Sequence, residues 1–241
     1  MRTNQSINAP PESSMTKQYR SLCTRQDLIR SAAEVIDRSG FAESSIVTIS
    51  SGAGVSTGGL HFHFKNKQVL GEAVELAAAQ ALLFITGGVP LRHPAPVQLL
   101  IDASHALVRG LAADPVLRAG FGLGRDATWQ GVVNLWEQWQ DWIQLVLTVA
   151  RDQGSLAPDV ALEGPVSAIT AVVAGLEVLG GKDEAWRSCR VITQFWQLLL
   201  PGLVTEVVLG GLIPEGSPAI PGAADVSWAP DTRLQQVCGV A

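Results

Sequence analysis

The sequence predicts an all-α fold, and three observations support this prediction. Apolar residues recur at intervals of three and four along several long segments, a spacing that places them on one face of a helix. Candidate strands are almost absent. Of the 241 residues, 47% are apolar and 16% are charged, which is enough apolar material for a large core.

The N-terminal segment, residues 1–20, is polar, contains Pro10 and Pro11, and is expected to be a disordered arm. The residues that follow predict a helix from Thr24 to Ser39, with Gly40 as a suitable C-terminal stop. The apolar residues expected on its inner face are Leu28, Ala32, Val35 and Ile36.

Residues 44–70 predict two short helices joined by a glycine turn, and then the start of a third helix. The starts fall at Ser45, Ser56 and Asn66, and the turn falls at Gly54. A serine hydroxyl at such a start can accept a hydrogen bond from an N–H group of the first helical turn. Two helices joined in this way form a helix-turn-helix, whose second helix usually lies in the major groove of DNA. We therefore assign residues 21–70 to a helix-turn-helix DNA-binding domain.

This stretch carries the pattern A-G-V-S-x-G-x-L-x-x-H-F-x-N-K and resembles the TetR family of bacterial repressors. The matching residues are Ile49, Ala53, Gly54, Val55, Ser56, Gly58, Leu60, His63, Phe64, Asn66, Lys67 and Leu70. The resemblance implies a three-helix DNA-binding domain followed by a helical ligand-binding and dimerisation domain, residues 71–212. It also implies a homodimeric repressor that binds a near-palindromic operator and is released by a small hydrophobic ligand.

The resemblance further implies which residues contact DNA. They are Thr48, Ser56, Thr57, Gly58, Gly59, His61, His63, Lys65 and Lys67. His61 stands where most of the family has a tyrosine, and an imidazole can also donate a hydrogen bond to phosphate. Two glycines follow Thr57, so the base-reading surface is thin. We expect much of the affinity to come from phosphate contacts by His61, Lys65, Lys67 and the helix start at Asn66.

Two other interpretations of these residues are disfavoured. Gly52, Gly54 and Gly58 resemble a nucleotide-binding loop, but that loop requires a βαβ context that the rest of the chain does not predict. His61 and His63 could suggest a metal site, but residues two apart on a helix point about 200° apart, which prevents a shared ion. The three cysteines lack metal-ligand spacing, so no metal and no cofactor is expected.

Charge is distributed unevenly along the chain. Residues 1–70 contain eight Lys or Arg and five Asp or Glu, a net charge of +3, whereas residues 71–241 have a net charge of −8. A positive N-terminal domain favours approach to a polyanion because the local field matters more than the total. The sequence shows neither a signal-peptide core nor an uninterrupted apolar run of membrane-spanning length. We expect a cytoplasmic, nucleoid-associated protein without membrane contact.

From the end of the DNA-binding domain onward, the sequence predicts six helices. Their expected ranges are 67–86, 97–113, 114–120, 128–153, 165–179 and 185–209, the last with a kink or stop at Pro201. The last two long helices are those that form the dimer interface in the TetR family. From residue 213 onward the chain is rich in Pro, Gly and Ser, and residues 213–241 are expected to be a disordered tail.

The segment DPVLRAGFGLGRD, residues 114–126, resembles the γ-butyrolactone receptors, a subgroup of the TetR family. Gly122 stands where that subgroup has an arginine. The resemblance implies that Trp139 contacts the ligand, and we expect the same pocket to be lined by Trp136, Leu107, Phe121, Val172 and Leu176. Leu176 stands where true lactone receptors carry a hydroxyl residue, so the sequence favours a pseudo-receptor that responds to an antibiotic. A γ-butyrolactone ligand remains the alternative.

A different class of function is also consistent with an all-α pocket, namely an enzyme or carrier that has kept a relic helix-turn-helix. The sequence shows no Ser-His-Asp pattern, no Cys-His pair at a spacing typical of a catalytic site, and no paired carboxylates. We therefore expect a protein that is not an enzyme, and a gel shift with the DNA upstream of its own gene separates the two classes.

Overall fold

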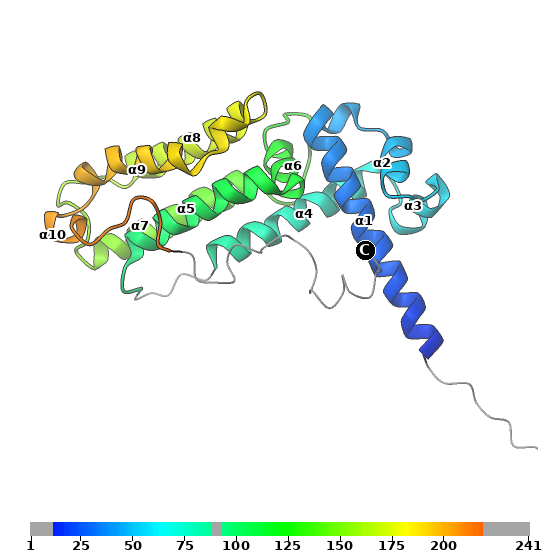
Figure 1. Ribbon diagram of the computed structural model, residues 1–241, viewed down its shortest axis with the longest axis horizontal. Coiled ribbons are helices and arrows are strands. Elements are labelled where there is room, and N and C mark those ends of the chain that lie inside the picture. Colours follow the sequence, from blue (N-terminus) through cyan, green and yellow to red (C-terminus); the bar gives the residue numbers. More distant parts are fainter. Residues whose placement is uncertain (1–11, 88–92, 219–241) are drawn as a thin grey trace, which may run out of the picture.

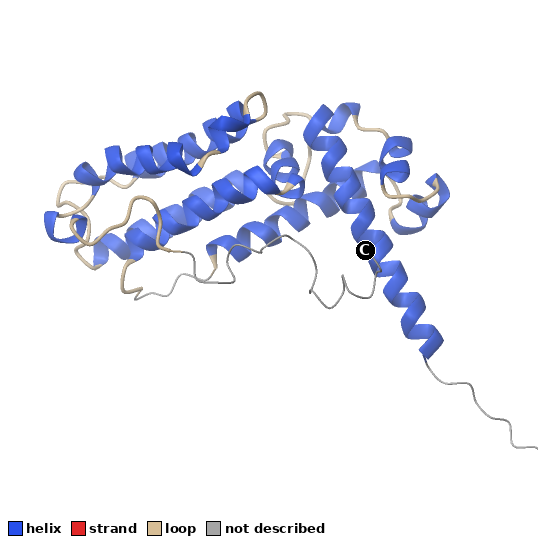
Figure 2. Ribbon diagram, viewed as in Figure 1, coloured by secondary structure: helices blue, strands red, loops and turns tan. Residues whose placement is uncertain are grey.

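The computed structural model describes residues 12–87 and 93–218, and it confirms the all-α prediction for these residues. A DNA-binding-type domain lies at one end, and a long helical body extends away from it (Figures 1 and 2). Strands are absent from the described residues, which contain only an isolated antiparallel bridge between Leu156 and Val204. The elements are α1 (Glu12–Glu43), α2 (Ile46–Gly52), α3 (Thr57–His63), α4 (Lys67–Thr86), α5 (Pro96–Ala113), α6 (Pro115–Leu123), α7 (Leu135–Asp152), α8 (Glu163–Gly180), the 3₁₀ turn η1 (Glu184–Arg187), α9 (Cys189–Leu203) and α10 (Glu206–Leu209).

Helices α1, α2 and α3 pack around one small core. Leu28 of α1, Ile49 of α2 and Leu60 of α3 are fully buried in this core. The Ser31 hydroxyl on α1 donates to the Ile49 carbonyl at 2.8 Å, and a Cβ at Gly52 would clash with that hydroxyl. The glycine therefore allows α2 to lie close to α1, which fixes the direction of the turn into α3.

Two of the three predicted helix starts are capped as expected. The Ser56 hydroxyl accepts from Gly59 N at 3.1 Å, and the Asn66 side chain accepts from Val69 N at 2.9 Å. Ser45 occupies the N-cap position of α2, but its side chain makes no capping hydrogen bond. Gly40 interrupts α1 with φ of 78°, a conformation that favours glycine because it has no Cβ.

The first helix begins earlier than the sequence indicated. It starts at Glu12, so residues 12–20 are helical, and the expectation of a disordered arm is wrong for them. Residues 1–11 lie outside the described residues.

Helix α6 lies between the DNA-binding-type domain and the body, against both α1 and α4 (Figure 1). Its Gly120 is buried against Ala78 of α4, and a Cβ at Gly120 would clash with the Ala78 methyl group. Helix α4 runs from the end of the helix-turn-helix into the body, where it packs with α5 and α7.

The segment 124–134, which joins α6 to α7, is a loop, so residues 128–134 are not the first turns of α7 as expected. Trp129 therefore lies outside the tryptophan helix, and its Nε1 donates to Glu75 Oε1 at 2.7 Å. The other carboxylate oxygen of Glu75 accepts from Val132 N at 2.7 Å and Val133 N at 3.1 Å. This buried carboxylate holds the loop on α4.

The C-terminal end differs from expectation in two ways. The predicted helix over 185–209 is divided into η1, α9 and α10, and α9 ends at Leu203, two residues after Pro201. Residues 213–217, expected in the disordered tail, form a turn on α5. Gln98 exchanges two hydrogen bonds with the Ile213 backbone, at 2.8 and 3.1 Å, and Ser217 N donates to Asp102 at 2.7 Å. Residues 219–241 lie outside the described residues.

Two of the described helices, α4 and α8, are long and apolar enough to cross a membrane. Half of the relevant window of α4 is buried in the fold, and a third of that of α8. Burial within the fold therefore explains more of the apolar residues of α4 than of those of α8.

The contact at Gly120 generates a stability prediction. Gly120→Ala should lower the free energy of unfolding by about 1–3 kcal/mol, because the added methyl group must push α6 away from α4. The measurement is urea denaturation followed by circular dichroism. In the matched control Gly164→Ala on α8, the new Cβ meets no atom within 4 Å, so stability should stay the same or rise by up to about 1 kcal/mol. Equal stability of both variants would contradict the close packing described here.

Candidate DNA-binding surface and buried tryptophan core

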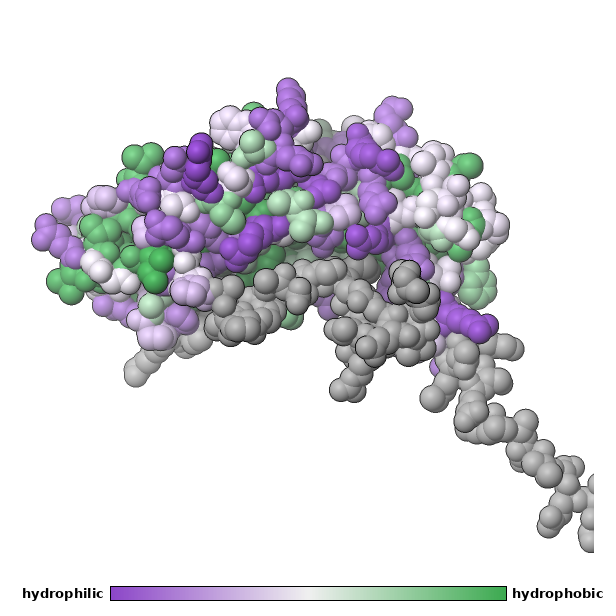
Figure 3. Space-filling model, viewed as in Figure 1, coloured by the Kyte–Doolittle hydropathy of each residue, from purple (hydrophilic) through white to green (hydrophobic). Residues whose placement is uncertain are grey.

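The predicted reading surface consists of small, exposed side chains on α2 and α3. Thr48, Thr57 and Gly58 are exposed, whereas Gly59 is half-buried. Ser56 is exposed too, but its hydroxyl is already engaged as the cap of α3. Residues of intermediate hydropathy gather around this end of the molecule, as Figure 3 shows. The surface offers few side chains that could form paired hydrogen bonds with a base edge.

The two histidines of α3 point in different directions. His61 is exposed, whereas His63 is half-buried with its ring 5.2 Å from that of Phe62. Burial, and then the nearby Arg25, lower the pKa of His63 below its ordinary value of 6.5, so this side chain is neutral at pH 7. His63 therefore adds no positive charge to the surface. In the described part of the chain, no group of three His, Cys, Asp or Glu residues is placed to hold a metal.

The structure gives Lys67 a different role from the predicted phosphate contact. Its Nζ donates to three backbone carbonyls at the end of α1, those of Phe41, Ala42 and Ser44, at 2.9, 3.0 and 3.1 Å. It also lies 4.7 Å from the centre of the Phe41 ring. An ammonium group has three donors, and all three are used. Lys67 thus caps α1 and joins α4 to it, while Lys65 remains exposed.

Three exposed residues at this surface were not predicted. Phe62 on α3 is 81% exposed and Val47 on α2 is 67% exposed. Exposed apolar groups in the reading position can contact the methyl group of thymine. Arg25 is also exposed, and its guanidinium lies 5.1 Å from the centre of the Phe64 ring. Phe62 was detectable from the sequence, because it lies four residues after Gly58 and thus on the same face of α3.

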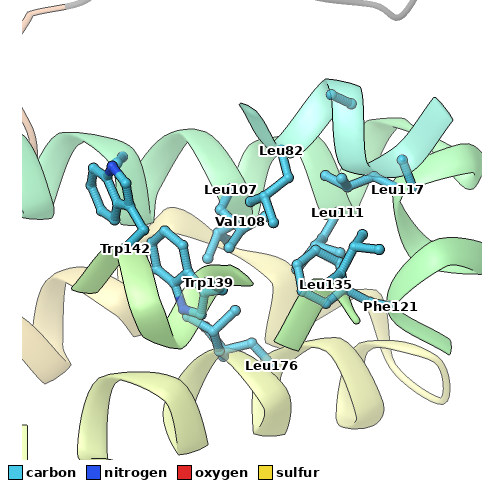
Figure 4. Close-up of a cluster of buried hydrophobic side chains, with 14 of the residues drawn as sticks. Leu82, Leu107, Val108, Leu111, Leu117, Phe121, Leu135, Trp139, Trp142 and Leu176 are labelled. Atoms are coloured by element: carbon cyan, nitrogen blue, oxygen red, sulfur yellow. The ribbon is translucent and has the colours of Figure 1, made fainter. Parts of the chain in front are cut away.

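The body of the protein contains a buried pair of stacked tryptophans on α7. Trp139 is 0% exposed, and its ring lies 5.3 Å from that of Trp142 with an angle of 15° between the planes. Figure 4 shows Leu107 of α5 and Leu176 of α8 on either side of Trp139. The Nε1 atoms of both tryptophans are buried without a hydrogen-bond partner. Buried indole N–H groups usually find an acceptor, so these two donors are an unusual feature of an apolar core.

Not all of the other predicted ligand-binding residues lie beside Trp139. Trp136 donates through Nε1 to the Phe121 carbonyl at 3.0 Å, and the two rings meet edge to face 4.5 Å apart. Both residues therefore join α7 to α6, and the indole donor of Trp136 is already used. Phe121 lies with Leu135, away from Trp139 (Figure 4). Val172 is half-buried on α8.

Sequence comparison agrees with the geometry of the DNA-binding-type domain. Residues 28–74 match the family model described as bacterial regulatory proteins, tetR family. The A-factor receptor protein of Streptomyces griseus is 26% identical over 203 residues, which cover 84% of this chain and 71% of that protein. The HTH-type transcriptional regulator SrpR of Pseudomonas putida is 27% identical over 186 residues, covering 73% of this chain and 85% of that protein.

Solved structures share the fold over most of the chain. A gamma-butyrolactone receptor, described as an ArpA-like protein, has a TM-score of 0.71 at 24% identity and covers 91% of this chain and 100% of that chain. CprB from Streptomyces coelicolor, in complex with its operator sequence, has a TM-score of 0.65 at 26% identity and covers 80% of this chain and 94% of that chain.

The different positions of Lys65 and Lys67 generate a prediction about duplex DNA. Lys65→Gln should weaken binding by a similar factor for all sequences and reduce the slope of log affinity against log salt by about 1. Lys67→Met should leave that slope unchanged but lower the free energy of unfolding by about 1–3 kcal/mol, because three carbonyls lose their donor. Fluorescence anisotropy at several salt concentrations and thermal denaturation measure the two effects. A reduced salt slope with unchanged stability in Lys67→Met would restore the phosphate role first predicted for it.

Proposed function

Because residues 28–74 match the tetR family of bacterial regulatory proteins and the chain is similar to the A-factor receptor protein of Streptomyces griseus, we propose that its homodimer represses transcription from a near-palindromic operator until a small hydrophobic ligand releases it. The observation that carries the ligand half of this proposal is the Trp139–Trp142 pair, whose two indole donors are buried without acceptors. A DNA-binding regulator works in the cytoplasm, and association with the nucleoid is part of the proposal.

On DNA, the α3 helices of the two subunits lie in successive major grooves, about 34–36 Å apart or a small multiple of that distance. Thr57 and Phe62 are the residues proposed to read bases. The exposed Lys65 and His61 and the N-terminal N–H groups of α4 are proposed to hold phosphates.

The ligand is proposed to enter between α5, α7 and α8 and to place an acceptor oxygen at Trp139 Nε1. Leu107 and Leu176 would then contact its apolar part. Leu176 is buried beside Trp139 and offers no hydrogen bond, which favours a ligand held mainly by apolar and aromatic contact. This supports an antibiotic-type molecule over a γ-butyrolactone.

A shift of α7 can reach the DNA-binding domain through α6. Trp136 of α7 is hydrogen-bonded to Phe121 of α6, and Arg118 of α6 contacts Asp37 of α1 at 2.8 Å. A ligand acts only through its different affinity for the two conformations. Changing the DNA-competent fraction from about 99% to about 1% requires a preference of about 10⁴.

The dimer is proposed to form through α8 and α9. Apolar side chains of these helices are exposed in the single chain, among them Val178, Leu179 and Leu198, the last at 83%. Only a third of the apolar window of α8 is buried within the chain, so a second copy would cover apolar surface that is otherwise in water.

The ligand half of the proposal is tested with Trp139→Phe. This change keeps an aromatic ring in the core but removes the indole donor, so operator binding in a gel shift should be retained. Release by an active compound should require about fivefold more of it, the effect of one lost hydrogen bond. The operator is the DNA upstream of the gene for this protein, and the compounds are a synthetic γ-butyrolactone and a panel of hydrophobic antibiotics.

Trp196→Phe is the matched control, because Trp196 of α9 is also fully buried with an unpartnered Nε1. Its response to ligand should equal that of the unaltered protein. Normal release of Trp139→Phe would place the ligand elsewhere. A protein that binds no DNA in this assay would instead support an all-α enzyme or carrier.

The dimer half of the proposal is tested with Leu198→Asp. A charged group at the centre of the proposed interface should shift the protein to a monomer in sedimentation velocity, because the carboxylate would be buried without a partner. Leu83→Asp on α4, where the side chain is also exposed, is the control and should remain dimeric. A dimeric Leu198→Asp variant would move the interface away from α9.

A further inference from the structure

A cavity lies between the two domains, and neither Trp139 nor Trp142 lines it. Its volume is about 350 Å³, and it is bounded by the end of α1, by α6 and the turn after it, and by the end of α8 with η1. In Figure 1 the turn after α8 lies near α6, across from the end of α1. The lining combines charged residues with apolar ones, the latter including Ile36, Phe41 and Leu123.

Three arginines line this cavity, and two of them are occupied by carboxylates. Arg118 donates through Nε to Asp37 at 2.8 Å and through Nη1 to the carbonyls of Leu111 and Ala112 at 3.0 and 3.2 Å. Arg125 Nη2 lies 3.0 and 2.9 Å from the two oxygens of Glu177. These contacts balance two positive charges with two negative ones.

The third arginine, Arg187 of η1, forms no ion pair among the described residues, although Asp37, Glu177 and Glu184 lie near enough to interact with its charge. Its Nη2 lies 3.5 Å from the Glu177 backbone carbonyl, and its Nε is buried without any hydrogen-bond partner. Burial lowers the pKa of this guanidinium from its ordinary value, but an arginine remains charged at neutral pH. The Nε atom lies against Gly180, so an anion in the cavity would be held by the Nη groups, of which Nη1 makes no hydrogen bond within the described residues.

The fold makes room for this arginine. A Cβ at Gly180, the last residue of α8, would clash with the Arg187 side chain, so the missing side chain lets the guanidinium lie across the end of the helix. Gly122 of α6 also lines the cavity, and a Cβ there would meet only Arg125 Nη2, at 3.9 Å. Gly122 thus leaves space on the α6 wall of the cavity, whereas Gly180 makes room for Arg187.

We infer that this cavity binds a small organic anion, a carboxylate on a short apolar body, with the carboxylate on Arg187 and Arg125 and the body against Ile36, Phe41 and Leu123. A carboxylate matches the planar donor arrangement of a guanidinium. Asp126, a third carboxylate of the lining, accepts two hydrogen bonds from Thr128. Recognition therefore depends on the free donors of Arg187 rather than on the net charge of the cavity.

The occupant would contact α1 of the DNA-binding domain and α6 of the body at once. Its binding is therefore expected to alter the position of the reading helix and with it the affinity for DNA. This site is separate from the ligand core at Trp139. It can be tested without an operator, so its failure would leave the proposed function untouched.

The test compares benzoate with benzamide, two molecules of nearly equal shape of which only the first is charged. In isothermal titration calorimetry, benzoate should bind the full-length protein at least about tenfold more tightly than benzamide, because a charge-assisted hydrogen bond is lost with the amide. Arg187→Gln should remove this preference. Arg151→Gln, which changes an exposed arginine of α7, should keep it.

A second variant tests the same cavity without depending on the correct folding of Arg187→Gln. Gly122→Leu should fill the cavity from the α6 wall and abolish benzoate binding while the circular dichroism spectrum and the melting temperature stay close to those of the unaltered protein. Equal binding of benzoate and benzamide, or unchanged benzoate binding in both cavity variants, would overturn the site. Unchanged operator affinity at saturating benzoate would overturn the effect on DNA binding.

Discussion

The close contact of α6 with α4 and α1 is the constraint on which the rest of this structure depends. Gly120 allows the α6 backbone to approach Ala78, and Arg118 reaches from α6 to Asp37 on α1 and to the last carbonyls of α5. One short helix is therefore fixed to the DNA-binding domain and to the body at the same time. The reading helix has no independent linker, so its position follows from the packing of the body.

A second set of contacts joins the same parts of the molecule. The buried carboxylate of Glu75 holds the loop before α7, and Trp129 of that loop packs edge to face on Phe41, 4.5 Å away. Lys67 then joins Phe41 to the start of α4. A displacement of α7 can therefore reach α1 by two routes, through α6 and through the loop that precedes α7. Two routes make a concerted movement more favourable than a local one, because interdigitated packing has few intermediate arrangements.

The sequence was sufficient for the features that depend on local chemistry. Helical periodicity, the caps at Ser56 and Asn66 and the glycine turn located the DNA-binding domain. It was insufficient where a side chain acts at long range. Lys67 looks like any surface lysine, and only the fold shows that α1 ends beside it. Trp129 fits the periodicity of the tryptophan helix, yet its hydrogen bond to Glu75, 54 residues away, keeps it in a loop. The cavity at Arg187 combines four segments of the chain and leaves no pattern in any one of them.

The small number of side chains available to read bases is related to the uneven distribution of charge along the chain. With two glycines after Thr57 and a neutral His63, the proposed reading surface offers few groups for base edges, and we expect sequence discrimination to rest largely on DNA shape and phosphate position. Such contacts would bind any duplex if the whole protein were basic. The net charge of −8 over residues 71–241 opposes that non-specific attraction. We expect that only a duplex that fits both subunits of the proposed dimer gains enough phosphate contacts to offset the repulsion. In the proposed dimer, specificity would therefore depend on the dimer geometry, which is the quantity that the proposed ligand would change.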